Sequence, residues 1–350
     1  MACVSPDIVL IRSRLLAWYD AHARSLPWRA AVGAARTEPY RVWLSEVMLQ
    51  QTTVPHATPY FHAFTTRWPT VSDLAAAEDA EVMGAWAGLG YYARARNLLA
   101  CARAVAREHG GVFPDTEAGL LALPGVGAYT AAAVASIAFD RAANVVDGNV
   151  ERVMARLFAV ETPVPAARPE LRRLAGLFVT DERPGDWAQA LMDLGATVCR
   201  PKSPSCGTCP VASECLGLAS GDPARFPLKT KKADRPHRRG AAYVLVDDQG
   251  RVAVETRPDK GLLGGMLGLP TSDWTTDAPS GAAPIEGDWR EAGAVEHVFT
   301  HFSLTLTVMT ARGQADGPWR WMAVEAARAA LPTVFAKALD RATVEPDLLL

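Results

Sequence analysis

Three groups of residues in this chain are of types that do chemistry. Glu46 lies in an apolar stretch, Asp147 lies in VVDGNV (145–150), and the string LPGVG (123–127) contains two glycines. Four cysteines also fall within residues 199–215. Carboxyl groups act as general acids or oppose a developing cation, backbone N–H groups at a glycine turn bind anions, and clustered cysteines bind metals.

The cysteines have the spacing C-x6-C-x2-C-x5-C and are Cys199, Cys206, Cys209 and Cys215. Packing cysteines usually scatter through a core, and disulfides are rare inside cells. The crowding therefore predicts a metal site. Chemistry alone leaves a four-thiolate zinc site, an iron-sulfur cluster and an electron-transfer protein as alternatives. Cys3 and Cys101 lie outside the pattern, and we expect them to be an N-terminal thiol and an ordinary helix residue.

Glu46 is preceded by Trp43 and followed by Leu49, each three residues away, so its helix face borders an apolar stripe. Burial there would raise the pKa of Glu46 and keep it protonated, as an acid catalyst requires. A glutamate on the exposed face of an amphipathic helix is the plainer alternative. For Asp147, which precedes a glycine, the plainer alternative is a helix N-cap or turn.

The chain of 350 residues changes character along its length. Residues 7–198 have a helical pattern, whereas 241–246, 252–256 and 302–310 alternate like strands, before two helical stretches near 321–330 and 334–341. This predicts a helical domain (1–198), a cysteine loop (199–218), a linker (219–239) and a smaller α/β domain (240–350).

Composition and charge restrict the function classes. The sequence lacks a long apolar run or a signal-peptide pattern, so we expect a cytoplasmic protein. The formal net charge of −2 argues against a uniformly basic nucleic-acid binder. It leaves room for local basic surfaces at 91–97 and 229–239.

The cysteine spacing resembles the cluster loop of the endonuclease III superfamily of DNA glycosylases, and LPGVG resembles its helix-hairpin-helix. The resemblance implies a 4Fe-4S cluster on the four cysteines and a DNA phosphate held at Gly125 and Gly127, often with a monovalent cation. It also implies that Asp147 is catalytic. Superfamily members that cleave the strand have a lysine where this chain has Tyr129, which implies a monofunctional glycosylase.

The segments LPWR (26–29), PYRVWLSEVMLQQTTV (39–54) and GLGYYARARN (88–97) resemble the MutY-type adenine DNA glycosylases within that superfamily. This implies excision of adenine opposite 8-oxoguanine, and also guanine, in duplex DNA. Glu46 would protonate the base at N7, and Asp147 would stabilise or capture the oxocarbenium-like sugar, leaving an abasic site. Tyr129 and Asn149 would support the charged sugar and the carboxylates.

The same resemblance places further residues at the DNA. A base inside a duplex must be flipped out before it can react. Gln51 and Tyr91 match the wedge that fills the gap, and Leu89 and Thr52 match positions near the opposite base. The residues that match the lining of the adenine pocket are Arg24, Leu26, Trp28, Arg29, Val54 and Gln189.

The C-terminal part resembles a MutT-like domain related to the Nudix hydrolases, from GLLGGMLGLP (261–270) onward. The run of glutamates that binds magnesium is missing, so pyrophosphate hydrolysis is not expected. HVFTHF (297–302) matches the segment that reads 8-oxoguanine, with Thr300 in place of serine and followed by His301. The resemblance thus implies a multidomain protein, all-α and then α/β, expected to act as a monomer on double-stranded DNA that contains 8-oxoguanine opposite adenine. If the protein is bacterial, it is expected at the nucleoid.

Two other functions compete with this interpretation. An endonuclease III-like enzyme would remove oxidised pyrimidines or mismatched thymine, but Tyr129, the helix around Glu46 and the extra domain count against it. A non-catalytic sensor of DNA damage would need neither Glu46 nor Asp147 beside phosphates.

Overall fold

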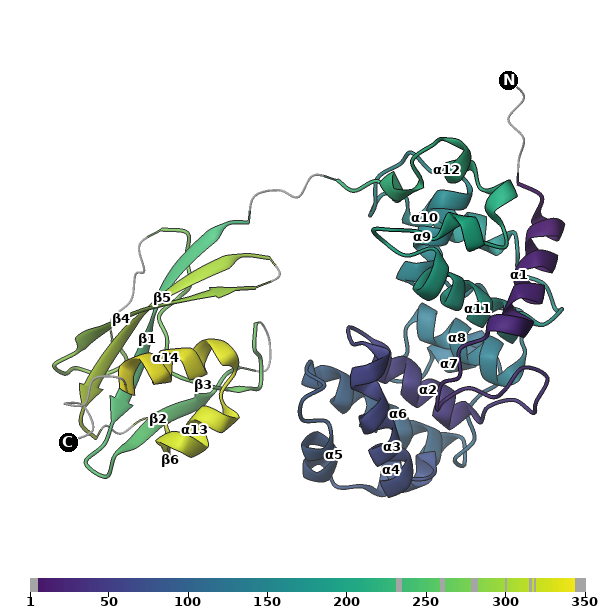
Figure 1. Ribbon diagram of the computed structural model, residues 1–350. Coiled ribbons are helices and arrows are strands. Elements are labelled where there is room, and N and C mark those ends of the chain that lie inside the picture. The colour runs from purple at the N-terminus through teal and green to yellow at the C-terminus, as the bar shows by residue number, and fades with distance from the viewer. Residues whose placement is uncertain are drawn as a thin grey trace. The chain divides into compact units, whose positions relative to one another are not determined.

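The computed structural model describes residues 6–230, 235–258, 262–277, 283–299, 301–314, 317 and 319–343. The chain forms two compact units, Met1–Thr230 and Lys231–Leu350 (Figure 1). In the described part, no helix is both long enough and apolar enough to span a membrane.

The first unit is helical, as the pattern over residues 7–198 predicts. A π-helical segment, Leu194–Val198, follows α11 directly. The helices are α1 (Ile8–His22), α2 (Pro39–Leu49), α3 (Val54–Arg67), α4 (Val71–Ala76), α5 (Asp79–Ala85), α6 (Tyr92–Glu108), α7 (Glu117–Leu121), α8 (Ala128–Phe139), α9 (Gly148–Leu157), α10 (Arg168–Gly176), α11 (Pro184–Asp193) and α12 (Leu216–Ala219).

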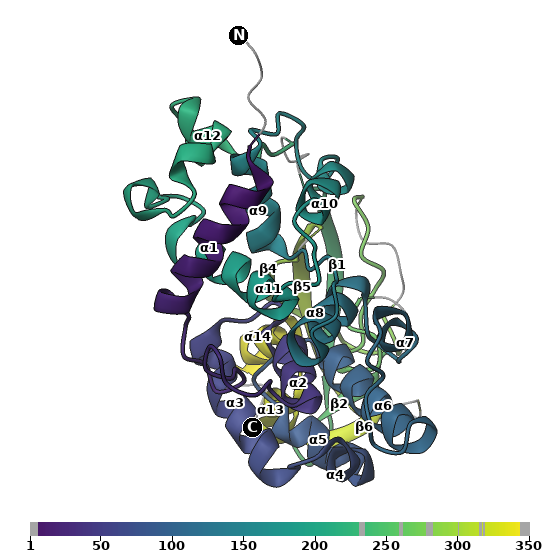
Figure 2. The ribbon, with the colours of Figure 1, turned by 90° about the vertical axis from the view of Figure 1, so that its right-hand side faces the viewer.

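Helix α8 is the centre of this unit and packs against α2, α7 and α11 (Figure 2). Its sequence, AYTAAAVASIAF, is apolar on nearly every face, and nine of its residues are buried, as expected of a helix enclosed by others. Small side chains allow close approach. A Cβ added to Gly185 of α11 would lie 2.7 Å from the carbonyl oxygen of Ser136 in α8. Helix α11 therefore packs closely against α8, which also contacts α2.

The second unit is a mixed sheet with two helices on one face. The strands are β1 (His237–Val246), β2 (Arg251–Thr256), β3 (Leu267–Gly268), β4 (Arg290–Val298), β5 (Ser303–Arg312) and β6 (Arg320–Ala323). Their order is β3-β2-β1-β5-β4, with β6 beside β2, and only β1 and β5 run parallel. Helices α13 (Val324–Ala330) and α14 (Thr333–Thr343) cover the core on one face (Figure 1).

Two details differ from the pattern read from the sequence. Residues 321–323 belong to strand β6 and not to a helix, because their backbone pairs with β2 through partners such as Met322 and Val252. The sequence pattern did not indicate strands β3 and β4. Strand β4 contains Gly293 at a register shift, which interrupts its alternation of buried and exposed residues.

The segment 219–239, expected to be a linker, contains the division between the two units. Residues up to Thr230 pair with the helical unit: the N–H of Val164 donates to the carbonyl of Leu228 at 2.9 Å, and the Thr230 hydroxyl donates to the carbonyl of Val164 at 2.8 Å. Strand β1 already begins at His237. The connection between these two anchored ends is therefore shorter than the composition of 219–239 indicates.

Candidate active site

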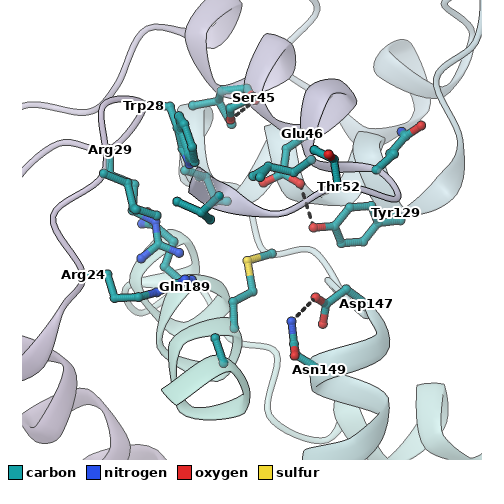
Figure 3. A pocket seen from close by; sticks show the side chains of 18 of the residues that line it. Arg24, Trp28, Arg29, Ser45, Glu46, Thr52, Tyr129, Asp147, Asn149 and Gln189 are labelled. Atoms are coloured by element: carbon teal, nitrogen blue, oxygen red, sulfur yellow. Dashed lines mark hydrogen bonds between the residues drawn. The ribbon is translucent and has the colours of Figure 1, made fainter. Parts of the chain in front are cut away.

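A cavity of about 450 Å³ opens between α2, α8, α9 and α11 in the first unit (Figure 3). Glu46 and Tyr129 lie on one wall, and Asp147 and Asn149 lie across from them. The other residues that were predicted from the sequence and that line this cavity are Arg24, Leu26, Trp28, Arg29, Gln51, Thr52, Val54 and Gln189. The structure thus brings together segments that are far apart in the chain.

Glu46 is buried in this wall, with its side chain directed into the cavity (Figure 3). The Tyr129 hydroxyl donates a hydrogen bond to its Oε2 at 2.7 Å. Burial raises the pKa of Glu46, and the negative charge of Asp147 acts in the same direction, whereas the Tyr129 hydrogen bond and the charge of Arg29 oppose the rise. Burial is the largest cause, so Glu46 keeps its proton to higher pH than an exposed glutamate does.

Tyr129 lies in the first turn of α8 and is a neutral donor. Burial, followed by the charges of Glu46 and Asp147, raises the pKa of Tyr129 well above its ordinary value. Its phenol is therefore neutral around pH 7. A phenol held neutral can orient a carboxyl group, but it cannot form the Schiff base that a lysine would form at this position.

Asp147 is the N-cap of α9 and also a wall of the cavity. Its Oδ1 accepts a hydrogen bond from the backbone N–H of Val150 at 2.7 Å, and its Oδ2 accepts one from Nδ2 of Asn149 at 2.9 Å. The capping role that is common for an Asp-Gly pair is thus present. It fixes the carboxylate with its charge toward the cavity, so capping and chemistry are compatible.

Arg152 was not singled out from the sequence, yet it supports this carboxylate. Its Nη2 donates to Oδ1 of Asn149 at 2.7 Å and to the carbonyl of Gly195 at 2.8 Å, and its Nε donates to the carbonyl of Cys199 at 2.8 Å. A Cβ on Gly195 would lie 2.6 Å from Cβ of Asn149. The π-helical segment therefore needs glycine here, and Arg152 links the cysteine loop to Asn149 and Asp147. The only sequence signal was its i,i+3 spacing from Asn149.

Asp193 was also not singled out from the sequence. It is the last residue of α11, is fully buried, and is held by Arg24 and Arg29 at the edge of the cavity. Nothing in LMDLGA (191–196) distinguishes it from an exposed helical aspartate, because both arginines come from the segment before α2.

Two exposed residues, Gln51 in the lining of the cavity and Tyr91 before α6, have unusual backbone conformations. Gln51 and Tyr91 have φ angles of 60° and 51°, a region that costs energy for residues other than glycine, and the Tyr91 side chain is 66% exposed. Arg94 ties their segments together, since it donates to the carbonyls of Val47 at 3.0 Å and Leu89 at 2.9 Å.

The side chain of Leu89, predicted near the opposite base, packs in the core and is only 5% exposed. Tyr92 packs against the same core. Of the two adjacent tyrosines, only Tyr91 is exposed.

The glycine turn connects α7 to α8. Gly125 has a φ angle of +71°, and an added Cβ would lie 2.5 Å from Cβ of Asn97 in α6, so both conformation and space require glycine. Gly127 is the exposed N-cap of α8. The first N–H groups of a helix have no partner within it, so this end of α8 can bind an anion.

The four cysteines line one small cavity together with Arg156 and apolar residues. In the described ranges, no three Cys, His, Asp or Glu side chains converge as the ligands of a single metal ion would. Arg156 is buried, and its Nη1 donates to Sγ of Cys199 at 3.3 Å. Four thiols around a shared cavity, with a buried cation beside them, can hold an anionic thiolate-bound metal group.

The predicted recognition loop of the second unit is described in part. Thr300 lies outside the described residues, and His301 is exposed. Val298 is 61% exposed, whereas the ring of Phe299 stacks on Trp274 with centroids 5.8 Å apart. The hairpin between β4 and β5 therefore presents one apolar side chain and anchors the next.

Comparisons with known proteins agree with both units. Residues 44–175 match the family described as HhH-GPD superfamily base excision DNA repair protein, and residues 241–341 match the NUDIX domain. The adenine DNA glycosylase of Homo sapiens is 36% identical over 365 aligned positions, and the alignment covers 86% of this chain and 67% of that protein. That of Mycolicibacterium smegmatis is 45% identical over 210 residues, covering 60% and 70%.

Solved structures resemble the first unit. A thermostable thymine-DNA glycosylase superposes with a TM-score of 0.55 and 29% identity, covering 61% of this chain and 97% of that one. A trapped endonuclease III-DNA covalent intermediate, at 23% identity and a TM-score of 0.51 over 61% of this chain and 98% of that one, shows the shared fold. The predicted fold is thus confirmed: a helix-hairpin-helix glycosylase core followed by a Nudix-like domain.

Proposed function

The chain belongs to the adenine DNA glycosylases, enzymes of base excision repair, and we propose that its substrate is adenine paired with 8-oxoguanine, and also with guanine, in duplex DNA. The observation that carries this proposal is the pairing of a buried Glu46, bonded to Tyr129, with Asp147 across one cavity. The cavity is large enough for one base.

Glu46 is the acid. Adenine is a poor leaving group, so its nitrogen, N7 in this proposal, must gain a proton as the glycosidic bond breaks. A carboxyl group whose pKa is raised by burial can supply that proton near neutral pH, which contributes roughly 10² to 10⁴ in rate. Tyr129 holds the carboxyl in place through its 2.7 Å hydrogen bond.

Asp147 meets the positive charge that develops on the sugar. It stabilises this oxocarbenium-like state or forms a bond to it, and water then completes the hydrolysis and leaves an abasic site, as in glycoside hydrolases with paired carboxylates. Asn149 fixes the orientation of Asp147 through its Nδ2. Because position 129 is a tyrosine, no lysine amine attacks the sugar there.

The flipped adenine enters between Trp28, Val54 and Gln189, and Gln51 and Tyr91 fill the space that it leaves in the duplex. The exposed phenol ring of Tyr91 and the strained backbone of both residues support this role. Thr52 lies at the same rim of the cavity, where it can reach the opposite base. The exposed N-terminus of α8, at Gly125 and Gly127, holds a DNA phosphate, with or without a monovalent cation.

Cys199, Cys206, Cys209 and Cys215 hold a 4Fe-4S cluster, which stabilises the loop 199–218 against the helical domain. Arg156 balances part of its negative charge. The cluster takes no part in the bond-breaking step, because the cysteines lie in a cavity of their own, apart from Glu46 and Asp147.

The α/β domain of the second unit, predicted to span residues 240–350, reads 8-oxoguanine with the hairpin between β4 and β5, using Thr300 and His301. The threonine keeps the hydroxyl that a serine would offer to the damaged base. The exposed Val298 and His301 on the same hairpin support this assignment.

The test is single-turnover cleavage of labelled duplexes in which adenine faces 8-oxoguanine, guanine or cytosine, analysed with and without alkali. We expect adenine-strand nicks only after alkali, fastest opposite 8-oxoguanine and slowest opposite cytosine. Nicks without alkali would contradict monofunctional chemistry. Tight binding without product would mean that the protein is a damage sensor. Replacement of Thr300 by alanine should reduce the preference for 8-oxoguanine more than the rate on the best substrate.

A further inference from the structure

Asp193 is a buried carboxylate whose two oxygens are both saturated by arginines. Nη1 of Arg29 donates to Oδ1 and to Oδ2, at 2.8 Å each. Nε of Arg24 donates to Oδ1 at 2.5 Å, and the backbone N–H of Arg24 donates to Oδ2 at 3.0 Å. The Asp193 side chain is fully buried and that of Arg29 is 7% exposed. Buried charges persist only when they are paired in this way.

This ion pair faces the base-binding cavity. Arg24, Arg29 and Gln189 lie together on one side of the cavity, and Glu46 and Tyr129 lie on another (Figure 3). The positive charge of Arg29 acts on Glu46 and favours its ionised form. A cation beside a carboxylic acid stabilises the ionised form and lowers the pKa of the acid. It therefore works against acid catalysis unless a nearby anion offsets its charge.

We propose that Asp193 is a positioning residue for adenine release: it holds the guanidinium of Arg29 at the cavity wall and offsets part of its charge, so that Glu46 keeps the proton that it donates to the base. This inference rests on the proposed function of Glu46. Asp193 is buried and fully paired, so it cannot contact DNA. Its role in the reaction is therefore indirect and acts through Arg29.

The other charged and titratable groups around Glu46 act in known directions. Asp147, before α9, favours the protonated carboxyl, and Tyr129 of α8 favours the ionised one through its hydrogen bond. Tyr19 of α1 lies near the ion pair, and burial raises its pKa to about 12, so it stays neutral. On α6, Arg94 is engaged with backbone carbonyls at the end of α2. Of the two arginines that share Asp193, Arg29 is the one whose charge acts on Glu46.

The experiment measures single-turnover adenine release from an 8-oxoguanine·adenine duplex as a function of pH. The acid form of Glu46 is lost as pH rises through its pKa, so the rate falls on the alkaline side. Asp193→Asn leaves Arg29 uncompensated and should move this fall to lower pH by about one unit. Arg29→Gln removes the cation, while Asp193 remains paired with Arg24, and should move the fall to higher pH.

The matched control is Asp186→Asn. Asp186 lies on the same helix, α11, and pairs with Arg183 at 2.8 Å, so this variant also breaks an aspartate–arginine pair. It should leave the pH profile in place. If Asp193→Asn slowed the reaction equally at every pH, Asp193 would have only a structural role and the proposal would be wrong.

A second readout does not depend on catalysis. The Glu46 carboxyl can be titrated by carbon-13 NMR in the full-length protein, with its resonance assigned by its loss in Glu46→Gln. The midpoint should fall in Asp193→Asn and rise in Arg29→Gln even if the wild-type protein released no adenine. Unchanged midpoints in both variants would overturn the proposal, whereas an inactive wild type with shifted midpoints would overturn only the function assigned to Glu46.

Discussion

Glu46 and Asp147 share one cavity but lie in opposite surroundings. Glu46 projects from the middle of α2, is only 8% exposed and receives one hydrogen bond, from a phenol. Asp147 begins α9, is partly exposed and accepts two N–H hydrogen bonds, one from the helix backbone. The first environment favours the neutral carboxyl, and the second supplies donors that suit a carboxylate.

In the proposed function, this difference in surroundings lets two similar side chains take different roles. Position in the fold divides the roles: the middle of a buried helix removes water, whereas the beginning of a helix supplies free N–H groups. Substitutions that exchange or remove these features should therefore act differently at the two sites.

The largest effect is expected for Glu46→Gln. The amide keeps the size of the side chain but has no proton to donate, so single-turnover adenine release should fall on the order of 10⁴-fold, while duplex binding persists. Glu38→Gln is the control, since Glu38 is the exposed N-cap residue of the same helix and makes no capping hydrogen bond. Comparable loss in both variants would show that α2 had been disturbed as a whole.

Asp147→Asn should reduce adenine release by about 10³-fold, because the developing positive charge on the sugar loses its partner. Asparagine caps helices as well as aspartate does, so the free energy of unfolding should change little. Asp147→Ala loses both functions and should also cost about 1 kcal/mol of stability. An active Asp147→Asn protein would reduce this residue to a helix cap.

Tyr129→Phe should have a smaller effect, about tenfold, because one hydrogen bond is lost. The 2.7 Å bond from Tyr129 favours ionised Glu46. Its removal should therefore shift the alkaline fall in rate to higher pH while lowering the maximum rate. A fall in rate without this shift would indicate that Tyr129 contacts the substrate and does not act on Glu46.

The smallest effect concerns stability. Because the pKa of Glu46 is raised in the folded state, folded protein binds a proton that unfolded protein releases, and stability falls as pH rises from the unfolded pKa through the folded one. Glutamine does not titrate, so this decrease of stability with rising pH is absent in Glu46→Gln. Its stability relative to wild type should increase with pH, by up to about 1.4 kcal/mol per unit of pKa shift. Urea unfolding at pH 5 and pH 8 measures this, and a constant difference would contradict it.

Local patterns in the sequence indicated much of this molecule. The helical period over 7–198, the LPGVG turn and the cysteine spacing each depend on neighbouring residues, and the structure has the corresponding helices, hairpin and shared cavity. The residues around Glu46 and Asp147 could be placed in one pocket because a family resemblance carried long-range information.

The parts that were missed depend on contacts between distant segments. Asp193 is distinguished only by two arginines that lie 164 and 169 residues away in sequence. The hydrogen bond from Arg152 to the carbonyl of Gly195 depends on a π-helical turn, and no local sequence pattern indicates that turn. The position of Leu89 near the opposite base stays a prediction, and its side chain packs in the core in the absence of DNA.

The most direct test of the division between the two carboxyl groups is to titrate them in the full-length protein without DNA. Carbon-13 NMR of labelled glutamate, with resonances assigned by Glu46→Gln and Glu38→Gln, compares a buried and an exposed carboxyl on one helix. We expect the midpoint of Glu46 to lie at a clearly higher pH than that of Glu38. A midpoint for Glu46 equal to or below that of Glu38 would contradict its role as the acid.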